Sequence, residues 1–274
     1  MKPAPFAYAR PASLDDALRM LSADAGDAMP IAGGQSLVPL LALRMSAAER
    51  LVDIGRLDAL RHVAETASTV TIGAGITHAE IEDGRVPDPA NGLMRRIASG
   101  IAYRAIRNQG TIGGSVALAD PAADWPSCLI ALRAVAKIAG PNGERHLAVT
   151  DLIEGIFATA LAPAELIVGF DIPKLAPTVR VGFAKVARKT GAFAMSLAIV
   201  VLDGADTRVV LGGASTRPLT LAHTSAALVT ADAREAALRD AIARDLDTID
   251  DLDAYAHRLH TATILRATAE ARAS

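Results

Sequence analysis

Two short glycine-rich segments carry the residue types that could hold a phosphate group. The first reads AGGQS over residues 32–36, and the second reads TIGGS over residues 111–115. Glycine reaches positive φ at little steric cost, so consecutive backbone N–H groups can point into one concavity that suits phosphate oxygens. A helix that begins directly afterwards adds free N–H groups and the positive end of its dipole. Two such turns could grip the two phosphates of one diphosphate.

A purely structural role is the alternative, because Gly-Gly pairs also form ordinary tight turns. Neither segment matches G-x-G-x-x-G or the Walker pattern G-x-x-x-x-G-K-[ST]. Neither contains a lysine, so a bound anion would be met mainly by backbone dipoles. The two segments therefore indicate an anion site without defining its ligand.

Other polar residues give weaker signals. Arg104 and Arg107 flank the second turn and could meet a phosphate, a partner carboxylate or only solvent. His257 and His260 share a helix face, but no third ligand accompanies them, so we expect no metal site. His78 is expected to be structural. No Ser-His-Asp set or working carboxylate pair is visible, so we expect no catalytic side chain.

Composition narrows the class of protein. The chain has 274 residues, 51% of them hydrophobic, and a formal net charge of −2, which predicts a globular protein without a nucleic-acid partner. Its one cysteine, Cys128, excludes an internal disulfide and a cysteine-ligated cluster within the chain. Prolines near the N-terminus argue against a signal peptide, and the longest apolar run, 193–202, is too short to span a bilayer. We therefore expect a cytoplasmic protein.

The elements that position the two turns follow from hydrophobic periodicity. Ser13 should cap a helix that runs to about Ser22, and a strand over 29–32 should lead into the first turn. Ser36 should cap the next helix, with Pro39 in its first turn. The remaining elements expected before the second turn are strands within 50–57 and 70–77 and a helix over 93–99.

Beyond the second turn, we expect a loop and then a helix from about Pro121, with Asp120 as its N-cap. Asp124 would lie too far into that helix to cap it, which favours contact with a ligand. A strand over 134–139 and a turn at 141–144 follow.

Pro173 and Pro177 bracket a linker, and we place a domain boundary near residue 176. Three strands are expected after it, over 179–187, 194–202 and 209–213, with two amphipathic helices at the end of the chain. Consecutive strands with short turns predict a small antiparallel sheet with helices on one face, so the fold class is α+β.

Three motifs in order and spacing resemble one family. "AGGQSLVPLLALRM", "RNQGTIGGSVALADPAADWP" and "FATALAPAELIVGFDIP" are similar to the FAD-binding medium subunit of the molybdenum hydroxylases, the xanthine dehydrogenase and carbon monoxide dehydrogenase family. The resemblance weakens over the C-terminal helices. It implies a two-lobed PCMH-type FAD-binding domain over 1–176. It also implies a C-terminal domain of the carbon monoxide dehydrogenase flavoprotein type over 177–274, with FAD extended between them.

The resemblance also assigns cofactor contacts. The diphosphate would lie between the two turns, Asp124 would reach the ribose or adenosine, Ile101 would make an apolar contact, and Ile167 and Lys185 would lie beside the adenine and isoalloxazine regions. The residues of the turns are Ala32, Gly33, Gly34, Gln35 and Ser36, and Thr111, Ile112, Gly113, Gly114 and Ser115.

Three positions depart from the family pattern. Gln35 stands where His or Asn is frequent, and Ser115 stands where Asn is common; both keep hydrogen-bonding capacity. Leu118 replaces the histidine of the usual "AHADPAAD" and cannot form a hydrogen bond, which puts any tuning of flavin reactivity by that histidine in doubt.

The resemblance implies an electron-transfer oxidoreductase subunit. Electrons would arrive from a [2Fe-2S] cluster on a separate small subunit and leave to NAD, a quinone, oxygen or another carrier. Substrate oxidation would occur on a large molybdopterin subunit, in a dimer of three-subunit units. Two alternatives stay open: a stand-alone FAD-dependent oxidoreductase, and a non-catalytic scaffold with a decayed flavin site.

Overall fold

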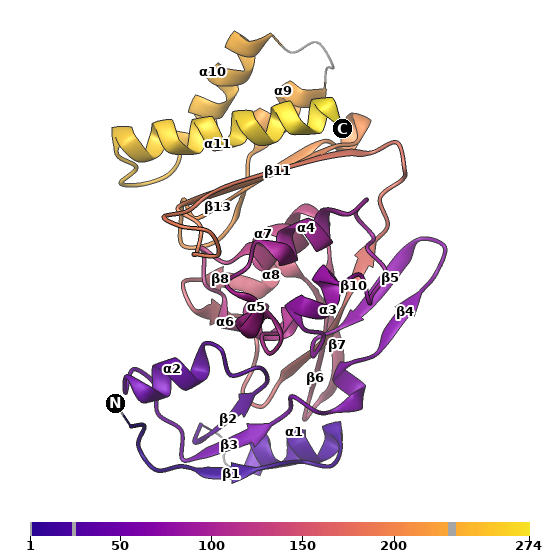
Figure 1. Cartoon of the computed structure of the whole chain (residues 1–274), viewed down its shortest axis with the longest axis vertical. Helices are drawn as coiled ribbons and strands as arrows, with labels where there is room; N and C mark the ends of the chain where they lie inside the picture. The colour runs from indigo at the N-terminus through magenta and orange to yellow at the C-terminus, as the bar shows by residue number, and fades with distance from the viewer. Residues whose placement is uncertain (1, 24–25, 230–233) are drawn as a thin grey trace.

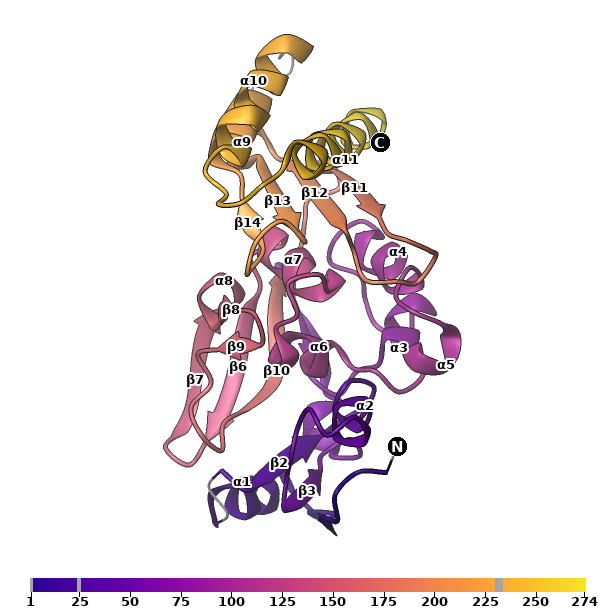
Figure 2. The ribbon, with the colours of Figure 1, turned by 90° about the vertical axis from the view of Figure 1, so that its left-hand side faces the viewer.

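The computed structural model describes residues 2–23, 26–229 and 234–274. Three bodies lie in a row along the long axis of the molecule (Figure 1). Separate sheets with helices packed on them confirm the expected α+β class. An N-terminal lobe lies at one end, a larger lobe lies in the middle, and the C-terminal sheet with its helices lies at the other end. Figure 2 shows the same order from the side.

The N-terminal lobe is a small parallel sheet covered by one helix. The strand order is β1 (Ala7–Ala9), β3 (Arg50–Asp53) and β2 (Ala28–Ile31). Helix α1 (Leu14–Ala23) begins where expected, because the Asp16 N–H donates to the Ser13 hydroxyl at 3.1 Å. Ala17 and Leu21 of this helix are buried in the lobe's own apolar cluster. Helix α2 (Leu37–Ala42) follows the first glycine turn.

The middle lobe is built on an antiparallel five-stranded sheet. Its order is β4 (Val63–Glu65), β5 (Thr69–Gly73), β10 (Leu166–Pro173), β6 (Val135–Gly140) and β7 (Gly143–Ala148). Its short helices and the small hairpin are α3 (His78–Glu82), α4 (Leu93–Ser99), α5 (Arg104–Arg107), α6 (Ile112–Leu118), α7 (Asp124–Ala131), α8 (Val149–Leu152), β8 (Ile153–Gly155) and β9 (Ala158–Thr159).

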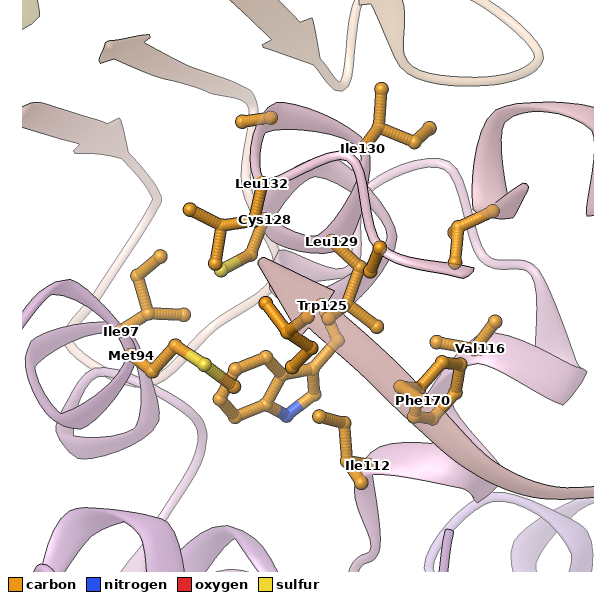
Figure 3. Close-up of a cluster of buried hydrophobic side chains, with 14 of the residues drawn as sticks. Met94, Ile97, Ile112, Val116, Trp125, Cys128, Leu129, Ile130, Leu132 and Phe170 are labelled. Carbon is orange, nitrogen blue, oxygen red and sulfur yellow. The ribbon is translucent and has the colours of Figure 1, made fainter. Parts of the chain in front are cut away.

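Helix α7 forms the centre of the main core. Trp125, Cys128 and Leu129 of this helix are fully buried and point toward side chains of α4, α6 and β10 (Figure 3). Burial of Cys128 raises the pKa of its thiol well above the ordinary value. All eight residues of the helix are buried, as expected for one enclosed between a sheet and other helices.

The predicted start of α7 is wrong. The helix begins at Asp124 rather than near Pro121, because Ala123 is still extended (φ −76°, ψ 147°). Asp120 does not cap it: its carboxylate accepts from the Ala122 N–H at 2.8 Å and closes a local turn instead. Asp124 is therefore the first residue of the helix, not an interior one.

The C-terminal sheet contains β11 (Arg180–Val186), β12 (Ser196–Leu202), β13 (Arg208–Gly212) and β14 (Leu219–Thr220) in that order. The two-residue β14 is a fourth strand that the sequence did not predict. The helices on the outer face of this sheet are α9 (Ala222–Val229), α10 (Glu235–Leu246) and α11 (Ala254–Ala273), one more than expected. Helix α11 approaches closely: a Cβ at Gly182 would overlap the carbonyl oxygen of Ala267.

The apolar core continues across residue 176. The cluster around α7 also contains Val179, Leu197, Ile199 and Val210 from the C-terminal part of the chain. A hydrogen bond also joins the middle lobe to the chain at residue 176, since the Asn91 amide donates to the carbonyl of Ala176 at 3.2 Å. The C-terminal sheet is thus packed directly onto the middle lobe.

Candidate functional site

The two glycine turns meet each other. A Cβ at Gly33 would overlap the carbonyl oxygen of Gln109 and lie 2.9 Å from Cα of Gly110, the residue before the second turn. Helices α2 and α6, which follow the turns, accordingly face each other where the N-terminal and middle lobes meet (Figures 1 and 2). Gly33 is required by this close backbone contact, and Gly34 by its positive φ of 69°.

The first turn presents a row of free donors. In the part of the chain that the structure describes, the backbone N–H groups of residues 33–37 donate to no acceptor. The Gln35 amide folds back onto the carbonyl of Gly33 at 2.8 Å. Ser36 is at the N-cap position of α2, but its hydroxyl makes no capping bond, contrary to expectation. The turn therefore keeps its N–H groups available for an external anion.

The second turn is different, because its N–H groups are already used. Ile112 and Gly113 donate to the carbonyls of Ile76 and Ala74 at 3.0 and 2.9 Å. The Gly114 N–H donates to the Thr111 hydroxyl at 3.0 Å, which caps α6. The Ser115 N–H donates to the carbonyl of Thr111 at 3.1 Å. These bonds correct the picture of two equivalent anion nests: the second turn is a capped helix start.

Packing explains the glycine at 113. A Cβ there would overlap Cβ of Ala74 and lie 2.7 Å from its carbonyl oxygen. Gly113 therefore lets α6 lie directly on the end of β5, whereas Gly114 is exposed. What remains for a ligand at this turn is the bare backbone at Gly114 and the Ser115 hydroxyl.

Asp124 and Lys185 come together although 61 residues separate them. The Lys185 ammonium donates to Oδ2 of Asp124 at 2.8 Å, and their side chains are 11% and 5% exposed. The second oxygen, Oδ1, is buried and has no partner among the described residues. Burial raises the pKa of this carboxyl, and the lysine charge only partly opposes that rise. A buried carboxylate oxygen without a donor is a place where a ligand hydroxyl or N–H would bind.

Ile101, predicted as an apolar contact, and Ile167, predicted beside the adenine and isoalloxazine regions, are placed differently. Ile101 is partly buried and packs against the edge of the main core. Ile167 is 5% exposed and lies within that core, next to an irregularity in the pairing of β10 with β6.

A pocket of about 560 Å³ opens beside the meeting point of the turns. Ala32, Gly33 and Thr111 line it, whereas the other predicted site residues do not. Its wall also includes ion pairs that the sequence did not reveal, among them Arg61–Glu80 at 2.5 Å and Arg104–Asp83 at 2.7 Å.

Arg104 and Arg107 meet carboxylates of their own chain. Both donate to Glu82 on α3, and Arg104 also pairs with Asp83. Hydrogen bonding to these arginines lowers the pKa of both carboxyls. Sequence spacing alone could not identify the partners, because Glu82 lies 25 residues before Arg107.

His78 and Trp125 form a hydrogen-bonded pair next to the second turn. The His78 N–H donates to the carbonyl of Gly110 at 2.9 Å, and its ring Nδ1 accepts from the Trp125 indole at 3.0 Å. Burial and the nearby charge of Arg107 lower the pKa of His78 to about 4, so the ring is neutral near pH 7. This places His78 in a structural role.

Two kinds of feature are absent from residues 2–23, 26–229 and 234–274. No three His, Cys, Asp or Glu side chains converge there in a way that could hold a metal ion. No helix in the same part of the chain is long and apolar enough to cross a bilayer.

The residues present fit a flavin dinucleotide. The free N–H groups of the first turn suit the diphosphate, and the bare backbone of Gly114 leaves room for close approach. The unpartnered oxygen of Asp124 suits a sugar or ribityl hydroxyl.

Comparison with known proteins bears on the same region. Residues 4–175 match the family model described as the FAD binding domain in molybdopterin dehydrogenase. The 6-hydroxypseudooxynicotine dehydrogenase complex subunit alpha of Paenarthrobacter nicotinovorans is 40% identical over 79% of this chain and 75% of its own. The carbon monoxide dehydrogenase medium chain of Afipia carboxidovorans is 36% identical over 74% and 70%. The structure of carbon monoxide dehydrogenase from Hydrogenophaga pseudoflava superposes with a TM-score of 0.93, at 30% identity over 100% of this chain and 99% of that one.

Proposed function

The chain belongs to the family of FAD-binding domains of molybdopterin dehydrogenases, and from this we propose that it relays electrons within a molybdenum hydroxylase complex. It is the FAD-binding medium subunit of such a complex, an oxidoreductase subunit. In our proposal, electrons come from a [2Fe-2S] cluster on a small subunit and pass to an external acceptor such as NAD or a quinone. Substrate oxidation takes place on a large molybdopterin subunit.

The observation that carries the cofactor site is the row of free N–H groups at residues 33–37. FAD supplies the redox chemistry when bound, and the protein supplies binding, orientation and electrostatics. We propose that this row binds the diphosphate, and that Thr111, Gly114 and Ser115 close on it from the other side. The Gln35 amide occupies the carbonyl of Gly33, so this acceptor is already bonded beside the row of N–H groups.

Asp124 and Lys185 are proposed to hold the polar part of the cofactor beyond the diphosphate. The free Oδ1 of Asp124 would accept a hydroxyl hydrogen, while Lys185 holds the other oxygen in place. Ile101 and Ile167 are proposed as apolar contacts. Ile167 would make its contact from the core, next to the β10 irregularity, because its side chain is 5% exposed.

We propose a division into a two-lobed FAD-binding domain over 1–176 and a C-terminal domain over 177–274, working as one packed unit in the cytoplasm. The partners are the small and large subunits, arranged as a dimer of three-subunit units. Relatives named as chains of dehydrogenase and hydroxylase complexes support partnership. Co-purification of both subunits with a tagged chain would test it, and isolation of the chain alone with substrate-reducible flavin would favour a stand-alone oxidoreductase.

The direct test of the site is a visible absorption spectrum of the purified chain, with mass spectrometry of the released cofactor. Stoichiometric FAD is the expected result. A colourless chain that takes up no FAD, either alone or with its co-purified subunits, would contradict the proposal and leave the scaffold alternative.

A further inference from the structure

Arg107 makes contacts that no other arginine of the second turn's flank makes. Its side chain is 12% exposed and grips Glu82 with two parallel bonds of 2.8 and 2.9 Å. Its remaining terminal nitrogen donates to two backbone carbonyls, those of Ile101 at 2.9 Å and Ala102 at 3.0 Å. The guanidinium thus ties α3 to the short turn at 101–102.

The 101–102 turn needs such support. Ala102 has a φ of 44°, in the left-handed region that residues with a Cβ rarely adopt. Its two neighbouring carbonyls converge on one cation, and a cation is the donor that holds two carbonyl dipoles together most strongly. Without Arg107, nothing else in the described structure bonds the carbonyl of Ile101.

The 101–102 turn is also the platform for the loop at 187–195, which joins β11 to β12. The Ala102 N–H donates to the carbonyl of Gly191 at 3.0 Å, and a Cβ at Gly191 would lie 2.6 Å from the oxygen of Ala102. The far end of this loop docks on the segment before α7, where the Ala194 N–H donates to the carbonyl of Ala122 at 3.2 Å. Asp124 follows Ala122 by two residues, and Lys185 precedes the 187–195 loop by two residues.

We infer that Arg107 is a positioning residue of the flavin site: it holds the 101–102 turn, and through it the 187–195 loop, in register with the second glycine turn. The inference rests on the proposed function, because Ile101, Asp124 and Lys185 are the groups it would place around the cofactor. Arg107 itself is turned toward Glu82 and the two carbonyls, so it acts through these residues rather than by touching FAD.

Arg104 provides the matched control. It lies on the same helix and shares Glu82, but its side chain is 46% exposed and bonds to the side chains of Glu82, Asp83 and Asn108. Among the described residues it bonds no backbone carbonyl of the 101–102 turn. Arg104→Gln therefore removes a similar charge from α5 without releasing the turn.

The experiment compares Arg107→Gln, Arg107→Lys and Arg104→Gln in the full chain, together with any subunits that co-purify. The Kd for FAD is measured by titration of the FAD-free protein, and the visible spectrum of bound flavin and the melting temperature are recorded. We expect Arg107→Gln to raise the Kd by on the order of tenfold and to change the flavin spectrum. Arg107→Lys should give a smaller rise, because one ammonium cannot reach Glu82 and both carbonyls. Arg104→Gln leaves the 101–102 turn bonded but alters the wall of the pocket beside the turns, so it should raise the Kd several-fold less than Arg107→Gln does.

The inference is overturned if Arg107→Gln lowers the melting temperature while leaving Kd and spectrum unchanged, because that pattern marks a merely structural ion pair. Equal effects of Arg107→Gln and Arg104→Gln would also overturn it. Should Arg107→Gln not fold, Arg107→Lys decides by the same two measurements. A wild-type protein that binds no FAD would instead refute the proposed function.

Discussion

Replacing Lys185 by methionine isolates the energetics of the buried carboxylate. The variant keeps much of the side-chain volume but removes the ammonium that lies 2.8 Å from Oδ2 of Asp124. Asp124 is 5% exposed, so its charge would be left in the interior without a counter-charge. The change therefore tests whether this pair, and not solvent, keeps the carboxylate ionised.

The cost has an upper bound that follows from proton linkage. Asp124 can always escape its unpaired charge by taking up a proton, and holding an ordinary carboxyl of pKa about 3.9 protonated at pH 7 costs about 4 kcal/mol. That bound falls by about 1.4 kcal/mol for each unit by which the pH is lowered. Because the pKa of Asp124 is already raised in the folded wild type, the loss caused by Lys185→Met lies below that bound. We expect about 2–3 kcal/mol of unfolding free energy at pH 7 and about half of that or less at pH 5.

The sign can be checked on the wild type. Burial raises the pKa of Asp124 in the folded chain, so the folded state binds its proton more readily than the unfolded state. Stability from this group is therefore present at low pH and is lost as pH rises from the ordinary carboxyl range through the raised folded value. Removing Lys185 raises that value further, which widens the loss at neutral pH.

The assay is urea unfolding of the FAD-free chain at pH 5, 6 and 7. Lys174→Met is the control, since Lys174 pairs with the half-exposed Glu65 and its loss should cost at most about 1 kcal/mol at any of these pH values. Adding Asp124→Asn to Lys185→Met should recover most of the loss at pH 7. A Lys185→Met cost that does not shrink at pH 5, or that equals the control at pH 7, would refute the reasoning.

Three further predictions follow from other contacts. Gly33→Ala should abolish FAD binding and destabilise the chain by about 2 kcal/mol or more, because the new Cβ meets the backbone of Gln109; Gly155→Ala, where nothing lies within 4 Å, should be nearly silent in the same calorimetry and titration. His78→Phe should cost about 1–3 kcal/mol by orphaning the indole N–H of Trp125, visible in the emission of this single tryptophan. The cost should be smaller at pH 6 than at pH 8 by about 0.8 kcal/mol, because the unfolded histidine takes up a proton below about pH 6.5 and the folded ring, with a pKa of about 4, does not. Glu270→Ala should loosen α11 from the middle lobe, because Glu270 pairs with Arg96 of α4 and accepts from the Phe183 N–H at 3.3 Å. Faster proteolysis after α10 is the expected result. An unchanged rate would show that this contact does not hold α11 on the middle lobe.

Local chemistry explains which elements the sequence predicts well. Ser13 bonds the N–H three residues on, and the helix over 93–99 has the predicted bounds, because caps and periodic apolar faces act within one or two turns. The predicted start of α7 near Pro121 is wrong because a proline at this position is compatible both with a helix start and with the turn closed by Asp120. The short strand β14 gave no periodic signal, since two residues form it.

The sequence by itself determined that the chain is an α+β protein with two glycine turns, and its motifs identified the family. Only the tertiary structure decided what each turn does. Whether an N–H is free depends on which distant carbonyl lies opposite it. Carbonyls of Ala74 and Ile76 accept from the second turn, whereas no described residue accepts from the N–H groups of residues 33–37. The same holds for Asp124, whose partner lies 61 residues away, and for Arg107, whose carbonyls are fixed only when α3, α5 and the 101–102 turn pack together. Hydrogen-bond saturation and burial are properties of three-dimensional neighbours, which residue types and spacing do not encode directly.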